Sequence, residues 1–179
     1  MNVLTTIALL LCCLGATQAQ DVPKDDAMKN CPMHARSSTN NHRAVIEKHG
    51  DEGMGFSHLA TTHHFWMVRD GGVIEVTTND AKDTASRDAI RSHLSHIAVL
   101  FSNGDFSTPM FVHDGIPPGV TTMKLLKPNI TYTYQELEKG GRVRIASSDP
   151  VAVAAVHDFL RFQIMEHQTG DSLDAEGGN

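Results

Sequence analysis

The chain has little cysteine, no basic segment and no apolar run long enough to cross a membrane. Two of its three cysteines, Cys12 and Cys13, lie in an apolar stretch near the amino terminus, and only Cys31 follows that stretch. A single thiol cannot close a disulfide within the chain, so the folded part must rely on a hydrophobic core. The net charge is −6, and lysine and arginine gather in no segment. This argues against nucleic acid or an anionic membrane surface as a partner.

Residues 1–19 have the pattern of a signal peptide. Val3–Gly15 is a short apolar core, and Thr17 and Ala19 put small residues at both positions that the peptidase reads. A membrane-spanning helix would need about 20 apolar residues. A lipoprotein would need a small residue before its cysteine, where this chain has Leu11. We therefore expect an exported protein, periplasmic or secreted after cleavage, with no stable membrane span once the signal is removed.

The rest of the chain divides by composition into three parts. Residues 20–53 are polar with few periodic apolar positions, which predicts a flexible arm. Residues 54–168 carry the apolar periodicity of a single domain. Residues 169–179 are acidic and rich in glycine, which predicts a disordered tail.

Two hairpins and two long helices account for most of the predicted domain. Alternation around Gly71-Gly72 predicts one hairpin over 63–78, and alternation around Gly140-Gly141 predicts another over 130–147. Helical spacing predicts one long helix from Asp83 or Thr84 to Asn103-Gly104, and another from Asp149-Pro150 to about His167. A short strand is expected over 110–113 and a short helix after Pro117-Pro118.

The predicted fold class is α+β. An antiparallel sheet built from the two hairpins, with helices packed on one face, is the simplest architecture for this order of elements. Residues 63–103 and 130–168 share one plan, a hairpin with a Gly-Gly turn followed by an amphipathic helix. A duplicated ββα unit would explain this, and so would coincidence, because the motif is common.

The sequence contains eleven histidines, all of them after residue 33. Neutral imidazole is the commonest metal ligand in proteins, and histidine is the side chain that titrates nearest to pH 7. The abundance of histidine therefore indicates a bound metal, a cofactor or proton chemistry.

The predicted metal site combines four of these histidines. His93 and His96 are three residues apart on the first long helix, so their side chains lie on neighbouring turns. His63 lies on the core face of the first hairpin, and His113 lies at the expected strand end. Three or four imidazoles suit copper or zinc, and iron is also compatible. Each histidine also has a structural interpretation, as a hydrogen-bonded residue at the core edge or as the polar flank of a helix.

Other residues are weaker candidates. His64, His157 and His167 could act as ligands, although the spacing of the last two prevents them from sharing one ion. A haem would need one axial histidine and an apolar pocket. Phe65, Phe101 and Phe111 could line such a pocket. In the arm, Cys31-Pro32-Met33-His34 resembles a short element of heavy-metal-binding modules in copper-handling proteins. The resemblance implies an accessory site formed by Cys31, Met33 and His34.

From Met54-Gly55-Phe56-Ser57 to Thr169-Gly170-Asp171 the chain resembles a family of exported bacterial proteins. The stretches that carry the resemblance are THHF, IRSHLSHIA, PPGV, GGRVRI and HDFLRFQIMEH. It implies a single exported domain over most of the mature chain, and it implies no activity and no site residues.

Three classes of function remain open on this evidence. The leading one is a domain that binds a transition metal or haem through several imidazoles. The second is a metal-dependent enzyme with an open coordination position, or a metal-free one using His113-Asp114 or His157-Asp158 as base and orienting carboxylate. The third is a metal-free interaction or structural module. The expected partner is a metal ion or a small molecule.

Overall fold

In the computed structural model the backbone is described for residues 32–175 and the side chains for residues 41–175. Ser38–Asn179 form one compact unit, which clusters apart from Met1–Ser37. The segment predicted as a signal peptide and Cys31 lie outside the described residues. The elements in chain order are α2 (Pro32–Met54), η1 (His58–Ala60), β1 (Thr61–Val68), β2 (Gly71–Thr78), α3 (Thr84–Ser102), α4 (Ser107–Val112), α5 (Val120–Leu125), η2 (Lys127–Asn129), β3 (Ile130–Leu137), β4 (Gly140–Ser147) and α6 (Pro150–His167).

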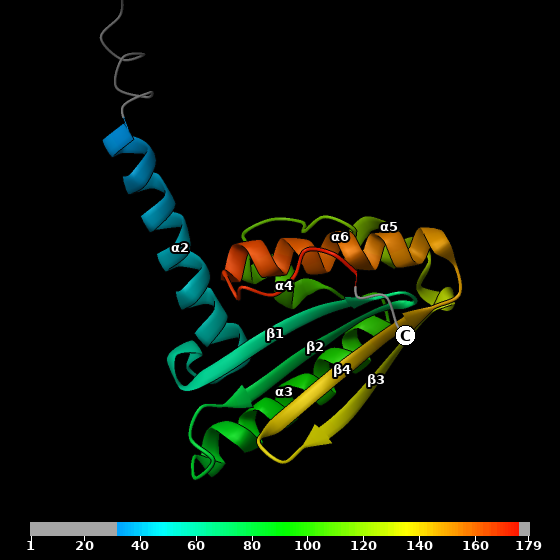
Figure 1. Ribbon diagram of the computed structural model, residues 1–179, viewed down its shortest axis with the longest axis horizontal. Coiled ribbons are helices and arrows are strands. Elements are labelled where there is room, and N and C mark those ends of the chain that lie inside the picture. Colours follow the sequence, from blue (N-terminus) through cyan, green and yellow to red (C-terminus); the bar gives the residue numbers. More distant parts are fainter. Residues whose placement is uncertain (1–31, 176–179) are drawn as a thin grey trace, which may run out of the picture. The chain divides into compact units, whose positions relative to one another are not determined.

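The four strands form one antiparallel sheet in the order β1-β2-β4-β3 (Figure 1). The two hairpins match in length and position, so that Thr61 corresponds to Ile130 and Gly71 to Gly140. Strands β2 and β4 lie side by side at the centre, and Ile74 pairs with its own counterpart, Val143. The sheet therefore has an internal pseudo-twofold axis through this pair. The predicted α+β fold with two hairpins in one antiparallel sheet is confirmed.

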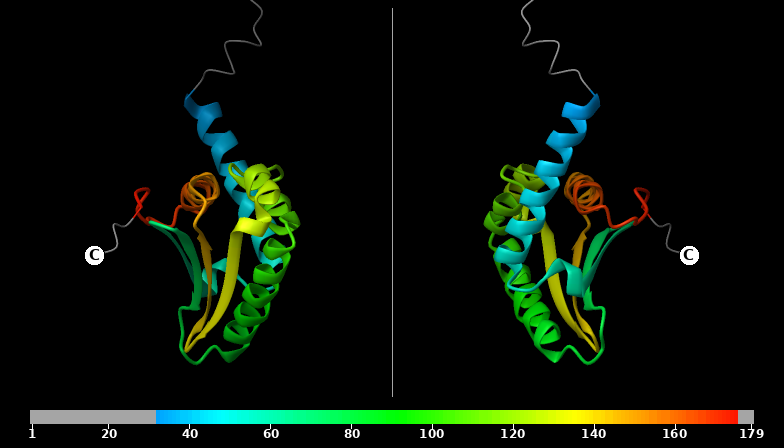
Figure 2. Two further views of the ribbon diagram at one scale, coloured as in Figure 1. Left: turned by 90° about the vertical axis from the view of Figure 1, so that its right-hand side faces the viewer. Right: turned by 90° about the vertical axis from the view of Figure 1, so that its left-hand side faces the viewer.

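Helices α3 and α6 cover the same face of the sheet (Figure 2). Leu160 of α6 packs over Gly72, and the Phe101 ring of α3 lies 5.8 Å from that of Tyr132, measured between ring centres. Both contacts are made to inward-facing positions of the strands, because successive strand residues point to opposite faces. The main core lies between this face and the two helices.

The two long helices begin where the sequence predicts. The Asp83 side chain accepts a hydrogen bond from the Ser86 amide at 3.0 Å, and Asp149 accepts one from Val151 at 2.8 Å. These are N-cap interactions, which satisfy amides that have no partner within the helix.

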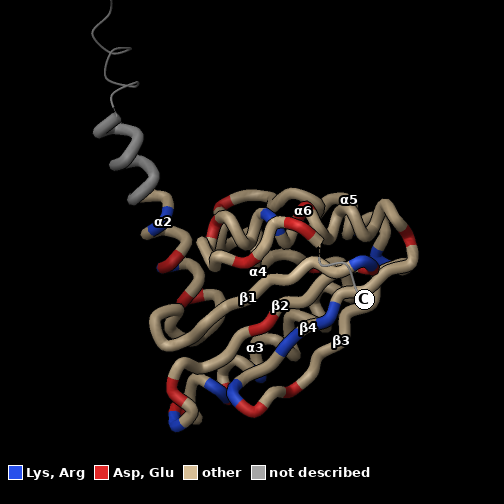
Figure 3. The backbone as a smooth tube through the Cα atoms, in the orientation of Figure 1, with Lys and Arg blue, Asp and Glu red and all other residues tan. Residues whose placement is uncertain are grey.

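The opposite face of the sheet carries charged pairs. Glu75 of β2 and Arg142 of β4 face each other in the register and form an ion pair of 2.9 Å. Arg144 pairs with Asp70 in the β1–β2 turn. Acidic and basic positions thus lie next to each other on the central strands (Figure 3).

Part of the predicted flexible arm is helical. Residues 32–54 form α2, which belongs from Ser38 onward to the same compact unit as the sheet. Arg43–Glu47 and Lys48–Glu52 are i,i+4 ion pairs, which support an isolated helix, and Ile46 is buried with 3 % exposure. The prediction relied on apolar periodicity, and one buried isoleucine does not produce a detectable period. None of the helices in the described part of the chain is long and apolar enough to span a membrane.

Two further predictions are wrong. Met110–His113 is not a strand: Ser107–Val112 forms helix α4, with the Asp105 carboxylate accepting from the Ser107 amide at its start. The tail is not disordered at its beginning. The Asp171 carboxylate accepts from the Phe65 amide at 2.9 Å and lies 2.8 Å from His64 Nδ1, which holds the segment against the β1 edge.

Candidate functional site

Two adjoining cavities lie beside strand β1. The inner chamber has a volume of about 80 Å³ and lies between the sheet, α3, α4 and α6. The outer chamber has a volume of about 230 Å³ and is lined mainly by α2, β1 and the end of α6. The two chambers share four lining residues, which are Gly50, Met54, His63 and His167. The side chains of this shared wall therefore face both spaces.

The inner chamber is mostly apolar, and its polar lining consists of a set of imidazoles together with Thr108 and Gln163. Its apolar lining includes Phe65, Val76, Leu94, Ile97, Phe101 and Phe159. The imidazoles are those of His63, His93, His113 and His167. Strand β1, helix α3, the end of α4 and the last turn of α6 each contribute one of them, so residues distant in sequence meet at one cavity.

Burial keeps these four imidazoles uncharged at neutral pH. Burial first, and neighbouring histidines second, lower the pKa of His63 to about 4, of His93 to about 4 and of His167 to about 3. Burial also lowers the pKa of His113. A neutral imidazole has a nitrogen lone pair available for a metal ion or a hydrogen-bond donor, whereas an imidazolium has none.

His113 has one ring nitrogen without a partner among the described residues. Its Nε2–H donates to Gln163 Oε1 at 3.1 Å, so Nδ1 is the unprotonated nitrogen. Nδ1 is buried, makes no hydrogen bond and lies 4.0 Å from Glu166 Oε2. An unsatisfied buried acceptor costs about 1–3 kcal/mol, so a hydrogen-bond donor at this nitrogen, such as a single water, would stabilise the fold.

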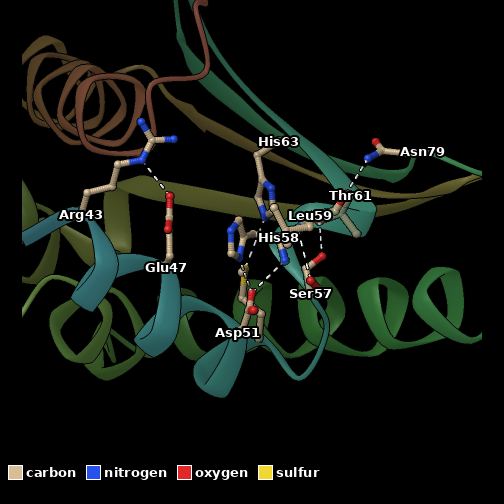
Figure 4. A network of polar contacts seen from close by, with 10 residues as sticks. Arg43, Glu47, Asp51, Ser57, His58, Leu59, Thr61, His63 and Asn79 are labelled. Atoms are coloured by element: carbon tan, nitrogen blue, oxygen red, sulfur yellow. Dashed lines mark hydrogen bonds and ion pairs between the residues drawn. The ribbon is translucent and has the colours of Figure 1, made fainter. Parts of the chain in front are cut away.

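His58, which lines the outer chamber, is held by a carboxylate outside it. The Asp51 carboxylate accepts from the His58 backbone amide at 2.7 Å and from its ring Nδ1–H at 2.8 Å. In the neutral ring this contact places the proton on Nδ1 and leaves the lone pair on Nε2, and it fixes the orientation of the ring (Figure 4). Arg43 pairs with Glu47 at the same chamber, with Nε and Oε1 2.7 Å apart.

The wall between the chambers brings a thioether next to two imidazoles. Met54 Sδ lies 3.3 Å from His63 Nε2. The ring centres of His63 and His167 are 6.3 Å apart, and those of His113 and His167 are 5.2 Å apart. In the described part of the chain, however, no three or more histidine, cysteine, aspartate or glutamate side chains are already arranged to hold a metal ion.

The structure brings together three of the four residues of the predicted metal site. His63, His93 and His113 line the inner chamber, whereas His96 is exposed on α3 and lines neither chamber. Of the i,i+3 pair on α3, His93 therefore faces the chamber and His96 does not. Of the predicted haem pocket, Phe65 and Phe101 line the chamber, but Phe111 is 48 % exposed and stacks on His49.

The weaker candidates have different environments. His167 lines both chambers. His64 stacks on Trp66 and bonds Asp171, and His157 Nε2 lies 2.9 Å from both the Val68 and the Gly71 carbonyl oxygens, which is a structural role. Cys31 lies outside the described residues, and so do the side chains of Met33 and His34.

Sequence reasoning missed His58. It precedes β1 in the short helix η1, where no apolar periodicity marks its environment. Its orienting partner, Asp51, comes from the end of a helix that the sequence did not predict. The Asp51–His58 spacing does not match the repeat of a helix or a strand, so spacing alone does not bring the two side chains together. The pair could have been found only by predicting α2 first.

Comparison of the chain with protein-family models, with curated proteins and with solved structures gives no match, so the geometry of the two chambers alone carries the argument about function.

Proposed function

We propose that the mature, exported chain binds one transition-metal ion at the wall between the two chambers, with His58, His63 and His167 as the imidazole ligands. The observation that carries the proposal is that these three imidazoles line one chamber, where the Asp51 carboxylate already orients His58 and the Met54 thioether lies 3.3 Å from His63 Nε2. Burial keeps His63 and His167 neutral, which is the protonation state that binds a metal.

The Asp51–His58 pair supports this choice of ligand. A metal-bound histidine almost always donates its other ring N–H to a carboxylate or carbonyl, which fixes its tautomer and orientation. His58 has this arrangement already, through Nδ1–H and the Asp51 carboxylate. His58 Nε2 is then the nitrogen that would bind the ion.

The spacing of the His63 and His167 rings is close to that of two ligands of one ion. With metal–nitrogen bonds of about 2.0–2.1 Å, two imidazoles on one tetrahedral ion have ring centres about 5 Å apart. The His63 and His167 centres are 6.3 Å apart. Turning a side chain off its preferred rotamer costs about 0.5–1.5 kcal/mol, whereas structural zinc binds with about 10–16 kcal/mol. Metal binding can therefore supply the free energy for the rearrangement.

The ligand chemistry favours copper over zinc. Met54 Sδ lies beside His63, and a thioether together with imidazoles suits Cu(I). Three imidazoles alone suit zinc or Cu(II) equally well. Replacing Met54 with leucine, which has nearly the same volume, separates these cases, because it should weaken Cu(I) binding and leave zinc binding unchanged.

The test is a metal titration on tag-free mature protein. We expect near-stoichiometric copper in the unaltered chain, and at least a tenfold loss of affinity in His63→Ala and in His167→Ala. Asp51→Asn should weaken binding about 10–100-fold, because it removes only the group that orients His58. Asp51 is partly exposed, so this variant should fold.

The matched control is His96→Ala, since His96 is exposed and lines neither chamber. It should bind metal like the unaltered chain. Equal affinities in the His63, His167 and His96 variants would refute the site, as would a folded protein that takes up neither copper nor zinc. Because burial lowers the pKa of His63 to about 4 and of His167 to about 3, these two ligands should remain unprotonated at pH 5.

A further inference from the structure

The inner chamber differs from the outer one in charge. No aspartate, glutamate, lysine or arginine is among the described residues that line it, whereas Arg43, Glu47 and Glu166 line the outer chamber. Its four imidazoles are neutral. An ion would lose its hydration there without gaining a charged partner, at a cost of several kcal/mol or more. The inner chamber is therefore suited to an uncharged molecule.

The size of the chamber limits that molecule further. An apolar cavity of about 150 Å³ admits benzene or xenon, and one water needs about 10–15 Å³. The inner chamber, with about 80 Å³, lies between these sizes. Phe65, Ile97 and Phe101 leave most of its wall without hydrogen-bonding groups, so dry apolar contents are favoured over a filling of several waters.

Gly50 leaves the passage between the two chambers open. It lines both, and a Cβ atom added there would meet only the end of the Met54 side chain, at 3.4 Å. Any larger side chain at this position would extend into the space beside His63 and His167. The helix itself would tolerate such a side chain, because glycine is the less favourable residue in a helix interior by about 1 kcal/mol.

We infer that the inner chamber binds a small, uncharged, apolar molecule, of the size of a diatomic gas or a short alkyl group, beside the imidazoles of His63 and His167. That this molecule lies next to a metal ion rests on the proposed function, whereas its binding in the inner chamber does not. The apolar molecule would contact the shared wall from the inner chamber, and the metal ion would enter its site from the polar outer chamber.

Xenon is the probe that tests the chamber without any metal. Metal-free protein labelled at isoleucine, leucine and valine methyl groups is titrated with xenon, and the methyl resonances are followed by NMR. We expect saturable shifts at Leu94, Ile97 and Val112, which line the chamber. The exposed Val99 and Val151 should not show them.

Gly50→Leu should reduce the xenon affinity at least fivefold by occupying part of the chamber that Gly50 lines, and Gly50→Ala should have a smaller effect. The control is Gly53→Ala on the same helix, where the added Cβ makes only ordinary contacts and neither chamber is lined. Equal xenon affinity in Gly50→Leu and in the unaltered protein would overturn the inference. Shifts that stay linear with pressure would do the same, since they would indicate a chamber filled with water only.

A second arm examines the link to the metal. In protein loaded with Cu(I), carbon monoxide should bind with a C–O stretching band that Gly50→Leu weakens or shifts while copper remains bound. Xenon binding without copper binding would retain the chamber and refute the proposed function. Copper binding with no effect of Gly50→Leu on xenon or on carbon monoxide would retain the metal site and refute the chamber.

Discussion

The two ββα halves of the molecule have the same backbone plan and different contents. Strands β1 and β2 match β3 and β4 in length, turn position and register about the central axis. The inward-facing residues of β1 include His63 and Phe65, whereas the corresponding residues of β3 are Tyr132 and Tyr134. The β1 side is next to both chambers, and neither tyrosine lines either of them. The sheet is a symmetric scaffold, and the candidate site is formed by the elements that pack beside β1.

The difference arises from segments that only the first half receives. Helix α2 and η1 precede β1, and α4 follows α3, so that Asp51, Met54, His58 and His113 all collect near the β1 edge. The buried polar ring of each half also has its own chemistry. Burial lowers the pKa of His63 and raises the pKa of Tyr132. Titration of His63 in the first half should therefore lower the free energy of unfolding in acid, and titration of Tyr132 in the second half should lower it in alkali.

The largest expected effect is acid destabilisation through the first half. Unfolded imidazoles take up protons near pH 6.5, whereas folded His63 does so only near pH 4. Between these values the unfolded state binds more protons, so the free energy of unfolding of metal-free protein falls as the pH is lowered. For His63 alone the loss by pH 4 is about 3 kcal/mol at 1.36 kcal/mol per pKa unit. Urea unfolding at pH 7, 5 and 4 measures it.

The variant that tests this assignment is His63→Gln, which keeps a polar side chain and removes the titration. Its unfolding free energy should change less between pH 7 and pH 4 than that of the unaltered protein. Tyr132→Phe, at the corresponding position of the second half, should keep the full acid dependence. An unchanged pH dependence in His63→Gln would mean that other groups cause the acid loss.

A smaller effect should distinguish two corresponding glycines. A Cβ atom on Gly72 would lie 2.1 Å from Leu160 Cδ1 and 2.7 Å from the Trp66 carbonyl oxygen. On Gly141 the nearest atom would be in the half-buried Tyr134 ring, at 2.9 Å, which can turn away. Gly72→Ala should therefore destabilise the fold by about 1–3 kcal/mol, and Gly141→Ala by less. Thermal unfolding of both variants decides the order, and equal losses would contradict the packing difference.

Much of the fold could be predicted because it depends on short-range patterns. The Gly-Gly turns, the alternation around them and the Asp83 and Asp149 caps each require only a few neighbouring residues. Helix α2 has i,i+4 charge pairs that the sequence shows, but it has no apolar period, and the burial of Ile46 at 3 % exposure is not apparent from its neighbours in sequence. Residues 110–113 look like a strand in isolation. The Asp105 side chain and the following turn make them helical instead.

The candidate site could be predicted only in part. His63 and His113 were identified by position on a face and at an element end, and both line the inner chamber. His96 was included because of spacing alone, and spacing does not tell which flank of α3 faces the cavity. His58 and His167 become neighbours through the packing of η1 and α6 beside β1. Sequence periodicity contains no information on that packing.

The smallest effect concerns the tyrosine at the position that His63 occupies in the first half. The Tyr132 hydroxyl is buried and makes no hydrogen bond in the described part of the chain. Removing an unsatisfied buried polar group recovers its desolvation cost, so Tyr132→Phe should leave the stability at pH 7 unchanged or raise it by about 1 kcal/mol.

Because the folded pKa of Tyr132 is raised, the unfolded state loses its phenolic proton first above pH 10. The unaltered protein should therefore lose stability as the pH rises through 10, and Tyr132→Phe should lose less. Tyr134→Phe, whose ring is less enclosed, is the control for urea unfolding at pH 7 and 10.5. A loss of stability in Tyr132→Phe at pH 7 would mean that the hydroxyl has a partner, such as an ordered water, and that the second half is not closed in the way its packing indicates.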